Sequence, residues 1–194
     1  MTEIWAYIIC VTICSLIWII NGRWLIHAVR KHVVSEIYIH TGLGIFFTLL
    51  VIELTLGNTV TLKLFDIFLI RVIGFILYIP SAYLVAASMH ALKHKGKPKA
   101  KDPTATTTFL DSGIYSIIRQ PMTLGMSIWS VALIMVFQSI LSMTLGTLSI
   151  LCFWTSARKE AVYNIKKFGK LYKDYMEKVP MWNFFKVLIR SKKR

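Results

Sequence analysis

Acidic residues are scarce in this sequence: 9 Asp and Glu stand against 23 Lys and Arg in 194 residues. Only 16% of the residues are charged, and the mean hydropathy is +0.61. Long uncharged runs at this composition exclude an ordinary soluble domain and predict an all-α, polytopic membrane protein. The positive charge is concentrated between the apolar runs, which favours contact with anionic lipid head groups over nucleic acid.

Common catalytic and metal-binding motifs are also missing. The three cysteines lie inside apolar runs, without C-x-x-C or Cys/His zinc spacing, so we interpret them as packing residues. His90 and His94 are four residues apart but have no third ligand, so we expect no metal and assign His94 to the cofactor or to a helix cap. The chain has no G-x-x-x-x-G-K-[ST] loop, dinucleotide fingerprint, H-E-x-x-H or Ser-His-acid signature. These absences exclude the common soluble nucleotide sites and hydrolases.

The apolar runs predict about five transmembrane helices, at residues 4–20, 37–56, 67–89, 122–137 and 140–155. The last two are short, are joined only by Gln138 and Ser139, and predict a helical hairpin. All Lys and Arg except Lys63 and Arg71 fall on one side of this topology, which predicts an N-terminus outside and a cytoplasmic tail. Glu53 and Arg71 are expected at similar depth, where an ion pair is the simplest arrangement.

The C-terminal segment is basic and amphipathic. Apolar residues recur every three or four positions between residues 158 and 178, which predicts a helix on the cytoplasmic membrane surface. We interpret residues 1–194 as one membrane domain: residues 1–66 hold the first two spans, and residues 67–194 hold the third span, the hairpin, the basic helix and the functional site.

A polar loop turns into a membrane helix between residues 110 and 125. Pro121 suits the first turn of a helix because it lacks an N–H. Such a helix start, flanked by Arg119, Gln120 and Tyr115, could bind an anion through unpaired N–H groups. A proline-started helix with no ligand explains the same residues equally well.

An ordered set of motifs covers about residues 90–183: Gly113-x-Tyr115, Arg119-Gln120-Pro121-x-x-x-Gly125, the hairpin, Glu160, Phe168-Gly169-x-x-Tyr172-x-x-Tyr175 and Val179-Pro180. This set resembles the integral-membrane methyltransferases, which include isoprenylcysteine carboxyl methyltransferase and the phospholipid N-methyltransferases. The family pattern Arg-His-Pro-x-Tyr-x-Gly has Gln120 and Thr123 here in place of His and Tyr. The isoprenylcysteine enzymes also tend to have an arginine where this chain has Ser156.

The resemblance implies S-adenosylmethionine as the methyl donor, bound at the cytoplasmic face. The candidate cofactor contacts are His94, Thr107, Thr108, Phe109, Leu110, Gly113, Tyr115, Gln120, Pro121, Met122, Thr123 and Glu160. Glu160 would hold the ribose hydroxyls or the amino group of the cofactor.

The methyl acceptor is expected to be a lipid or prenylated molecule that enters from the bilayer. The carboxylate of a prenylated cysteine needs no general base, only a cation such as Arg119 or Arg158 to orient it. A phospholipid amine is the alternative and would need Glu160 as a base. From another class, the chain could be a non-catalytic membrane adaptor, which would not require Tyr115, Arg119, Pro121 and Glu160 together.

Overall fold

The computed structural model describes residues 2–57, 62–96 and 108–182, and all regular elements in these ranges are helices. The helices are α1 (Thr2–Arg30), α2 (Val34–Leu56), α3 (Phe68–Lys95), the short 3₁₀ helix η1 (Gly113–Ser116), α4 (Pro121–Phe137), α5 (Ile140–Phe168) and α6 (Lys170–Lys178). Within the described ranges, α1, α2, α3 and α5 are long and apolar enough to cross a membrane, and α4 is a shorter apolar helix. The all-α, polytopic fold is confirmed.

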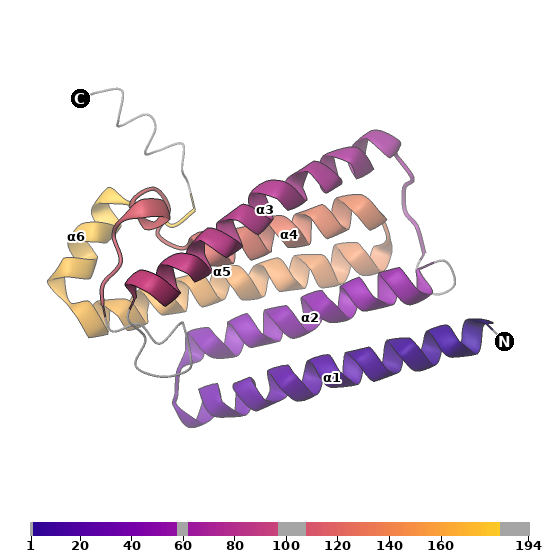
Figure 1. Cartoon of the computed structure of the whole chain (residues 1–194), viewed down its shortest axis with the longest axis horizontal. Helices are drawn as coiled ribbons and strands as arrows, with labels where there is room; N and C mark the ends of the chain where they lie inside the picture. The colour runs from indigo at the N-terminus through magenta and orange to yellow at the C-terminus, as the bar shows by residue number, and fades with distance from the viewer. Residues whose placement is uncertain (1, 58–61, 97–107, 183–194) are drawn as a thin grey trace.

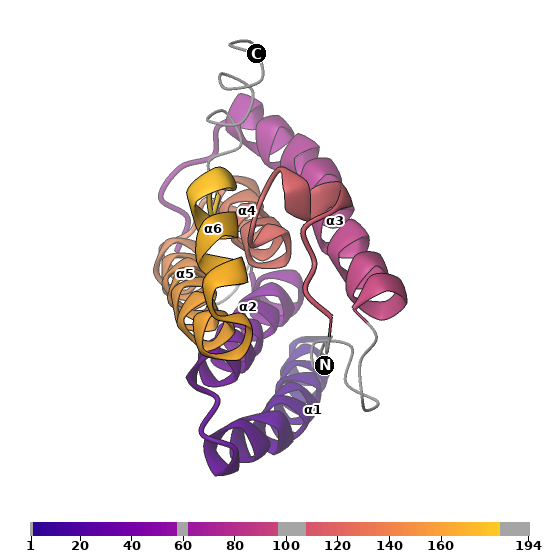
Figure 2. The same cartoon turned by 90° about the vertical axis from the view of Figure 1, so that its left-hand side faces the viewer.

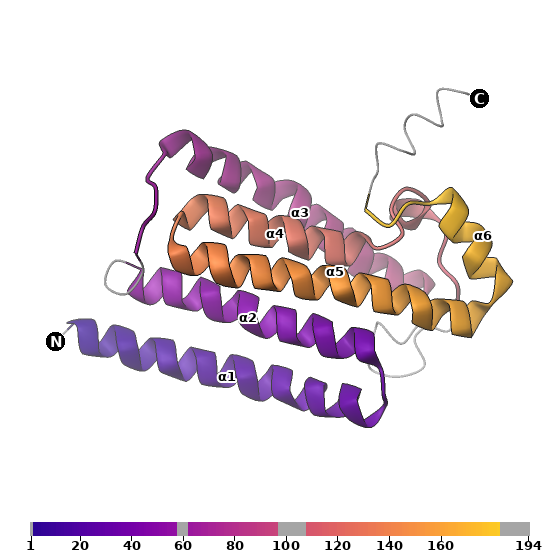
Figure 3. The same cartoon turned by 180° about the vertical axis from the view of Figure 1, so that it is seen from behind.

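The long helices run side by side in an order that differs from the chain order. α1 packs on α2, α2 on α5, α5 on α4, and α4 on α3 (Figures 1 and 3). Phe46 of α2, Leu133 of α4 and Phe153 of α5 meet in the buried core. Large apolar side chains on α1 and α3 face outward instead, as expected for surfaces that contact acyl chains.

Small residues bring α3 and α4 close together. Ser81 donates a hydrogen bond to the carbonyl oxygen of Gly125 at 2.7 Å. A Cβ on Gly125 would lie 2.9 Å from Val85 Cγ2 and 3.0 Å from the carbonyl oxygen of Ser81. This contact fixes the first turns of α4, which directly follow the Arg119-Gln120-Pro121 motif.

The predicted basic helix is not a separate element. α5 continues without a break from the hairpin to Phe168, and it ends at Gly169, which has a φ of +61°. Residues such as Ala157 and Ala161 keep helical propensity beyond the apolar run and are buried against neighbouring elements. Only Lys170–Lys178 forms the second helix, α6. The end of the apolar run is therefore not the end of the helix.

At the far end of the bundle, the α2–α3 connection is bonded to the α4–α5 turn. Leu64 N donates to Gln138 O at 2.9 Å, and the Gln138 side chain bonds both the N–H and the carbonyl of Ile67, at 2.9 and 3.0 Å. The predicted Glu53–Arg71 ion pair is wrong. Arg71 pairs instead with Asp66, which lies only five residues before it in the chain. Glu53 accepts a hydrogen bond from the hydroxyl of Ser139.

Candidate active site

The motif residues gather at the end of the bundle where α3 ends and α4 begins. Figure 2 looks onto this end, where α6 lies across the ends of α4 and α5 and the 108–120 segment passes between α6 and α3. The hydroxyl of Tyr175 donates to the carbonyl oxygen of Tyr115 at 2.5 Å. Phe109 packs edge-on against Tyr175, with ring centroids 5.1 Å apart. These contacts hold α6 and the loop before α4 as one unit.

The two residues before α4 are bonded to the segment after α6. The N–H of Arg119 donates to the carbonyl of Pro180 at 3.0 Å, and the N–H of Gln120 donates to the carbonyl of Met181 at 3.3 Å. Pro121 has no N–H to offer. These bonds occupy the N–H groups of the two residues before α4, whereas the amides of its first turn belong to Met122 and Thr123.

A cavity of about 420 Å³ lies beneath this unit. Its polar wall includes Ser35, Glu36, His40, Arg119, Gln120, Glu160 and Asn164, and its apolar wall includes Ile39, Leu43, Met89, Leu92, Met122 and Met126. Leu43, Met89 and Met126 lie farther along α2, α3 and α4 toward the middle of the bundle. The cavity therefore combines a polar end near α6 with an apolar part that extends into the membrane-spanning region.

Glu160 is the central acid of the polar end. It lies on α5, and the side-chain amides of Gln120 and Asn164 are within hydrogen-bonding reach of its carboxylate. Asn164 follows one helical turn after Glu160 and was not among the predicted site residues. Gln120, the residue that replaces the histidine of the family pattern, thus orients this carboxylate from the loop before α4.

Besides Glu160, this end of the cavity has three polar groups that carry no negative charge: the hydroxyls of Tyr115 and Tyr172 and the guanidinium of Arg119. Burial, with nearby Glu160 and Tyr175, raises the pKa of Tyr115 far above its ordinary value, so its phenol stays protonated. The hydroxyl of Tyr172 and Nε of Arg119 are buried and make no well-formed hydrogen bond with any described residue. Unpaired buried polar atoms are costly, so these two groups suit a polar ligand that bonds them.

The cavity contains most of the predicted site residues. Thr108, Phe109, Leu110, Tyr115, Arg119, Gln120, Met122 and Glu160 all line it. Pro121 and Thr123 are fully buried behind this wall, and Gly113 is exposed with a φ of +65°. Thr107 lies outside the described residues.

Two further predicted residues, His94 and Arg158, also do not line the cavity. The His94 ring packs against His90, with centroids 4.4 Å apart, and the Arg158 guanidinium lies 4.7 Å from the ring centroid of Trp154. Arg119 is therefore the predicted cation that the structure brings to the cavity.

Sequence reasoning missed the contribution of α2, which supplies Ser35, Glu36, Ile39, His40 and Leu43. Ser156, at the position where an arginine is usual, donates a hydrogen bond to the carbonyl of Ser35 at 2.8 Å and so joins α5 to α2. The available signal was the pair Glu36 and His40, two titratable residues four positions apart in an otherwise apolar run.

Tyr175→Phe tests the contact between α6 and the loop. The variant loses the hydrogen bond to Tyr115 but keeps the ring packing, so we expect a loss of about 1 kcal/mol of stability and a melting temperature lower by about 3 °C. Circular dichroism in detergent measures the change. Tyr83→Phe removes an exposed hydroxyl from α3 and is the control; equal melting temperatures for the two variants would contradict the role assigned to Tyr175.

Comparison with known families supplies an independent result. Residues 69–171 match the family model described as phospholipid methyltransferase. Among curated proteins and among solved structures, none is significantly similar to this chain. The matched region holds α4, α5 and Glu160 but excludes α1 and α2. Because it spans more than half of the chain, the protein belongs to the phospholipid methyltransferase family and is an integral-membrane methyltransferase.

Proposed function

We propose that the protein transfers a methyl group from S-adenosylmethionine to the carboxylate of a prenylated cysteine. The observation that carries this proposal is the single cavity in which Glu160 and Arg119 share a polar end that continues into apolar walls of α2, α3 and α4. A polar cofactor and a lipid-linked acceptor can then meet inside one space. We further infer that this end faces the cytoplasm, because nearly all Lys and Arg belong to this side of the predicted topology.

The residues present fit the cofactor. Glu160 offers a carboxylate to a cationic amino group or to ribose hydroxyls, and the buried hydroxyl of Tyr172, near Asn164 and Gln120, offers a further polar contact. When bound, the cofactor supplies an activated methyl group on a sulfonium. The aromatic rings of Phe109, Tyr172 and Tyr175 exclude water from this end of the cavity. The chain therefore contributes alignment and desolvation, which is what an already activated methyl group requires.

Arg119 favours a carboxylate acceptor. Its NH1 group makes only long contacts with the carbonyl oxygens of Met176 and Val179, at 3.4 and 3.5 Å, and its Nε has no partner among the described residues. Arg119 can therefore bind an incoming carboxylate without breaking a strong internal bond. We also retain Arg158 as a secondary candidate from the sequence, one that would have to leave Trp154 to reach the acceptor.

A phospholipid amine is the second candidate acceptor. The name of the matched family favours it. In addition, Glu36 and His40 of α2 line the same cavity as Glu160 and could take the proton that an ammonium must lose before it attacks.

The first test is calorimetric titration of the detergent-purified protein with S-adenosylhomocysteine. We expect saturable one-to-one binding, followed by methyl transfer to a farnesylated cysteine derivative when labelled S-adenosylmethionine is supplied. Transfer to phosphatidylethanolamine alone would replace the prenylcysteine proposal with the aminolipid one. The absence of binding in a folded, monodisperse sample would contradict both and favour a non-catalytic adaptor.

A further inference from the structure

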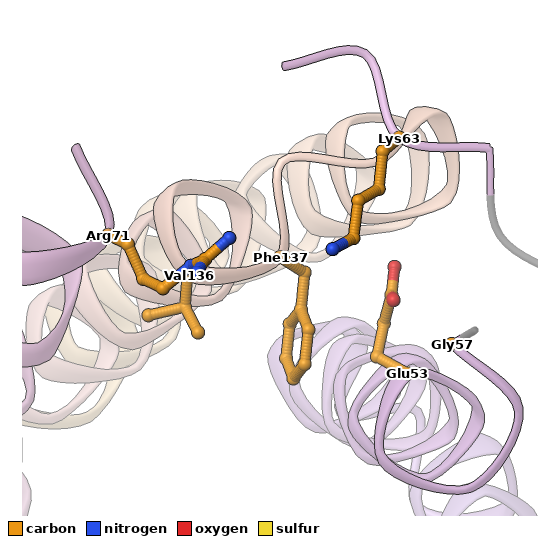
Figure 4. Close-up of a pocket in the computed structure, with 6 residues that line it drawn as sticks. All are labelled: Glu53, Gly57, Lys63, Arg71, Val136 and Phe137. Carbon is orange, nitrogen blue, oxygen red and sulfur yellow. The ribbon is translucent and has the colours of Figure 1, made fainter. Parts of the chain in front are cut away.

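A second cavity, of about 210 Å³, lies at the opposite end of the helix bundle. Glu53, Gly57, Lys63, Arg71, Val136 and Phe137 line it. In Figure 4 the carboxylate of Glu53 and the ammonium of Lys63 point toward one another across the cavity, and the guanidinium of Arg71 lies beside Val136. Charged groups of both signs thus face one small space, far from the active-site cavity.

The carboxylate in this cavity is buried and fixed in place. Glu53 is only 6% exposed, and the hydroxyl of Ser139 donates a hydrogen bond to it. Ser139 is held in turn as the N-cap of α5, where its side chain accepts from the N–H of Ser142 at 2.9 Å. A well-placed positive partner further stabilises a buried carboxylate. The Glu53 side of the cavity is therefore rigid and suited to a positively charged group.

The two basic residues are more exposed and are balanced by Asp66. Lys63 Nζ lies 3.8 Å from an Asp66 oxygen, and Arg71 pairs with the other oxygen of the same carboxylate. The four charged side chains sum to zero, so the cavity region has no net preference for an anion or for a cation. A zwitterion matches it better, because its two charges can each meet an opposite charge.

The surface around this cavity is apolar. The α2–α3 connection and the first turn of α3 expose Leu62, Leu64, Phe65, Ile67, Phe68 and Leu69. In a membrane protein such side chains contact acyl chains or the interface. A ligand that occupies the polar cavity from this side therefore has apolar chains beside its charged group.

We propose that this cavity binds the head group of a phospholipid of the phosphoethanolamine type. The primary ammonium donates hydrogen bonds to Glu53, and the phosphate is bound by Lys63 and Arg71, while the acyl chains lie along the exposed apolar residues of the α2–α3 connection. A choline head group carries the same charges but cannot donate a hydrogen bond to Glu53. An anionic head group would offer no positive charge to Glu53.

The test is native mass spectrometry of the full chain in detergent, titrated with phosphatidylethanolamine, phosphatidylcholine and free phosphoethanolamine. We expect phosphatidylethanolamine to bind about tenfold more tightly than phosphatidylcholine, as one charge-assisted hydrogen bond allows. Equal binding of the two lipids to the wild-type protein would overturn the proposal without any variant. Free phosphoethanolamine that binds as tightly as the lipid would overturn the assignment to a lipid.

Variants of the full chain test at which cavity the phospholipid binds. Glu53→Gln keeps an oxygen for Ser139 but removes the charge. Phosphatidylethanolamine and phosphatidylcholine should therefore bind this variant with equal affinity. Lys63→Gln combined with Arg71→Gln should weaken both lipids, and Lys93→Gln, an exposed change at the other end of α3, should weaken neither. Glu160→Ala alters only the active-site cavity, so this variant should still bind phosphatidylethanolamine more tightly than phosphatidylcholine. A preference that survives Glu53→Gln would place the lipid elsewhere and contradict the proposal.

Discussion

Glu160→Ala is expected to weaken binding of S-adenosylhomocysteine by at least about a hundredfold, because two hydrogen bonds from the ligand to the Glu160 carboxylate would be lost, each worth roughly 1.5–3 kcal/mol. The carboxylate lies at the polar end of the cavity, and Gln120 and Asn164 are both placed to orient it. Alanine would leave these two amides without their partner as well. Calorimetric titration measures the affinity directly, and methyl transfer should fall with it.

Two variants separate the charge from the shape of Glu160. Glu160→Gln keeps the size of the side chain and should recover part of the affinity if hydroxyl groups are bound, but little if a cationic amino group is bound. Asp174→Ala removes an exposed carboxylate from α6 and should leave the affinity unchanged. Wild-type affinity in Glu160→Ala would remove Glu160 from the site.

Gly125→Leu is expected to destabilise the folded protein by about 3 kcal/mol, equivalent to roughly 10 °C in melting temperature. The added Cβ alone would lie 3.0 Å from the carbonyl oxygen of Ser81 and 2.9 Å from Val85 Cγ2. The first of these is a backbone atom of α3, so the clash is relieved only if α3 and α4 separate. Thermal unfolding followed by circular dichroism measures the loss.

The same chain offers a matched control. A Cβ on Gly22 of α1 would meet no atom within 4 Å, so Gly22→Leu adds the same side chain at an open position. We expect Gly22→Leu to melt near the wild-type temperature. If Gly125→Leu has the same melting temperature as Gly22→Leu, the close approach of α3 and α4 does not limit the stability of the protein.

Hydropathy predicted the membrane helices because an apolar run of sufficient length has few other stable places in a protein. The same signal could not predict that α5 continues to Phe168. Beyond Thr155 the sequence becomes polar while its helical propensity persists, and only Gly169, with its positive φ, ends the helix. The end of a helix and the end of an apolar run are separate properties, and the sequence near residue 156 shows only the end of the apolar run.

The site was predictable where its residues share a motif and unpredictable where they meet through packing. Tyr115, Arg119, Gln120 and Glu160 were expected together, and they line one cavity. His40 joins them only because α2 packs against α5, a contact that no local pattern indicates. The expected Glu53–Arg71 pair failed for a similar reason: similar depth does not determine which neighbour, here Asp66, is nearer.

The hydrogen bonds from Arg119 and Gln120 to Pro180 and Met181 affect how the protein is made. The apolar helices in the described part of the chain, α1 to α5, all precede Pro180, so they can insert and pack while this segment is still being synthesised. The loop before α4 gains its backbone partners only after residue 181 has left the ribosome. A chain that has been synthesised only as far as α6 therefore lacks the backbone partners of the loop that borders the candidate active site.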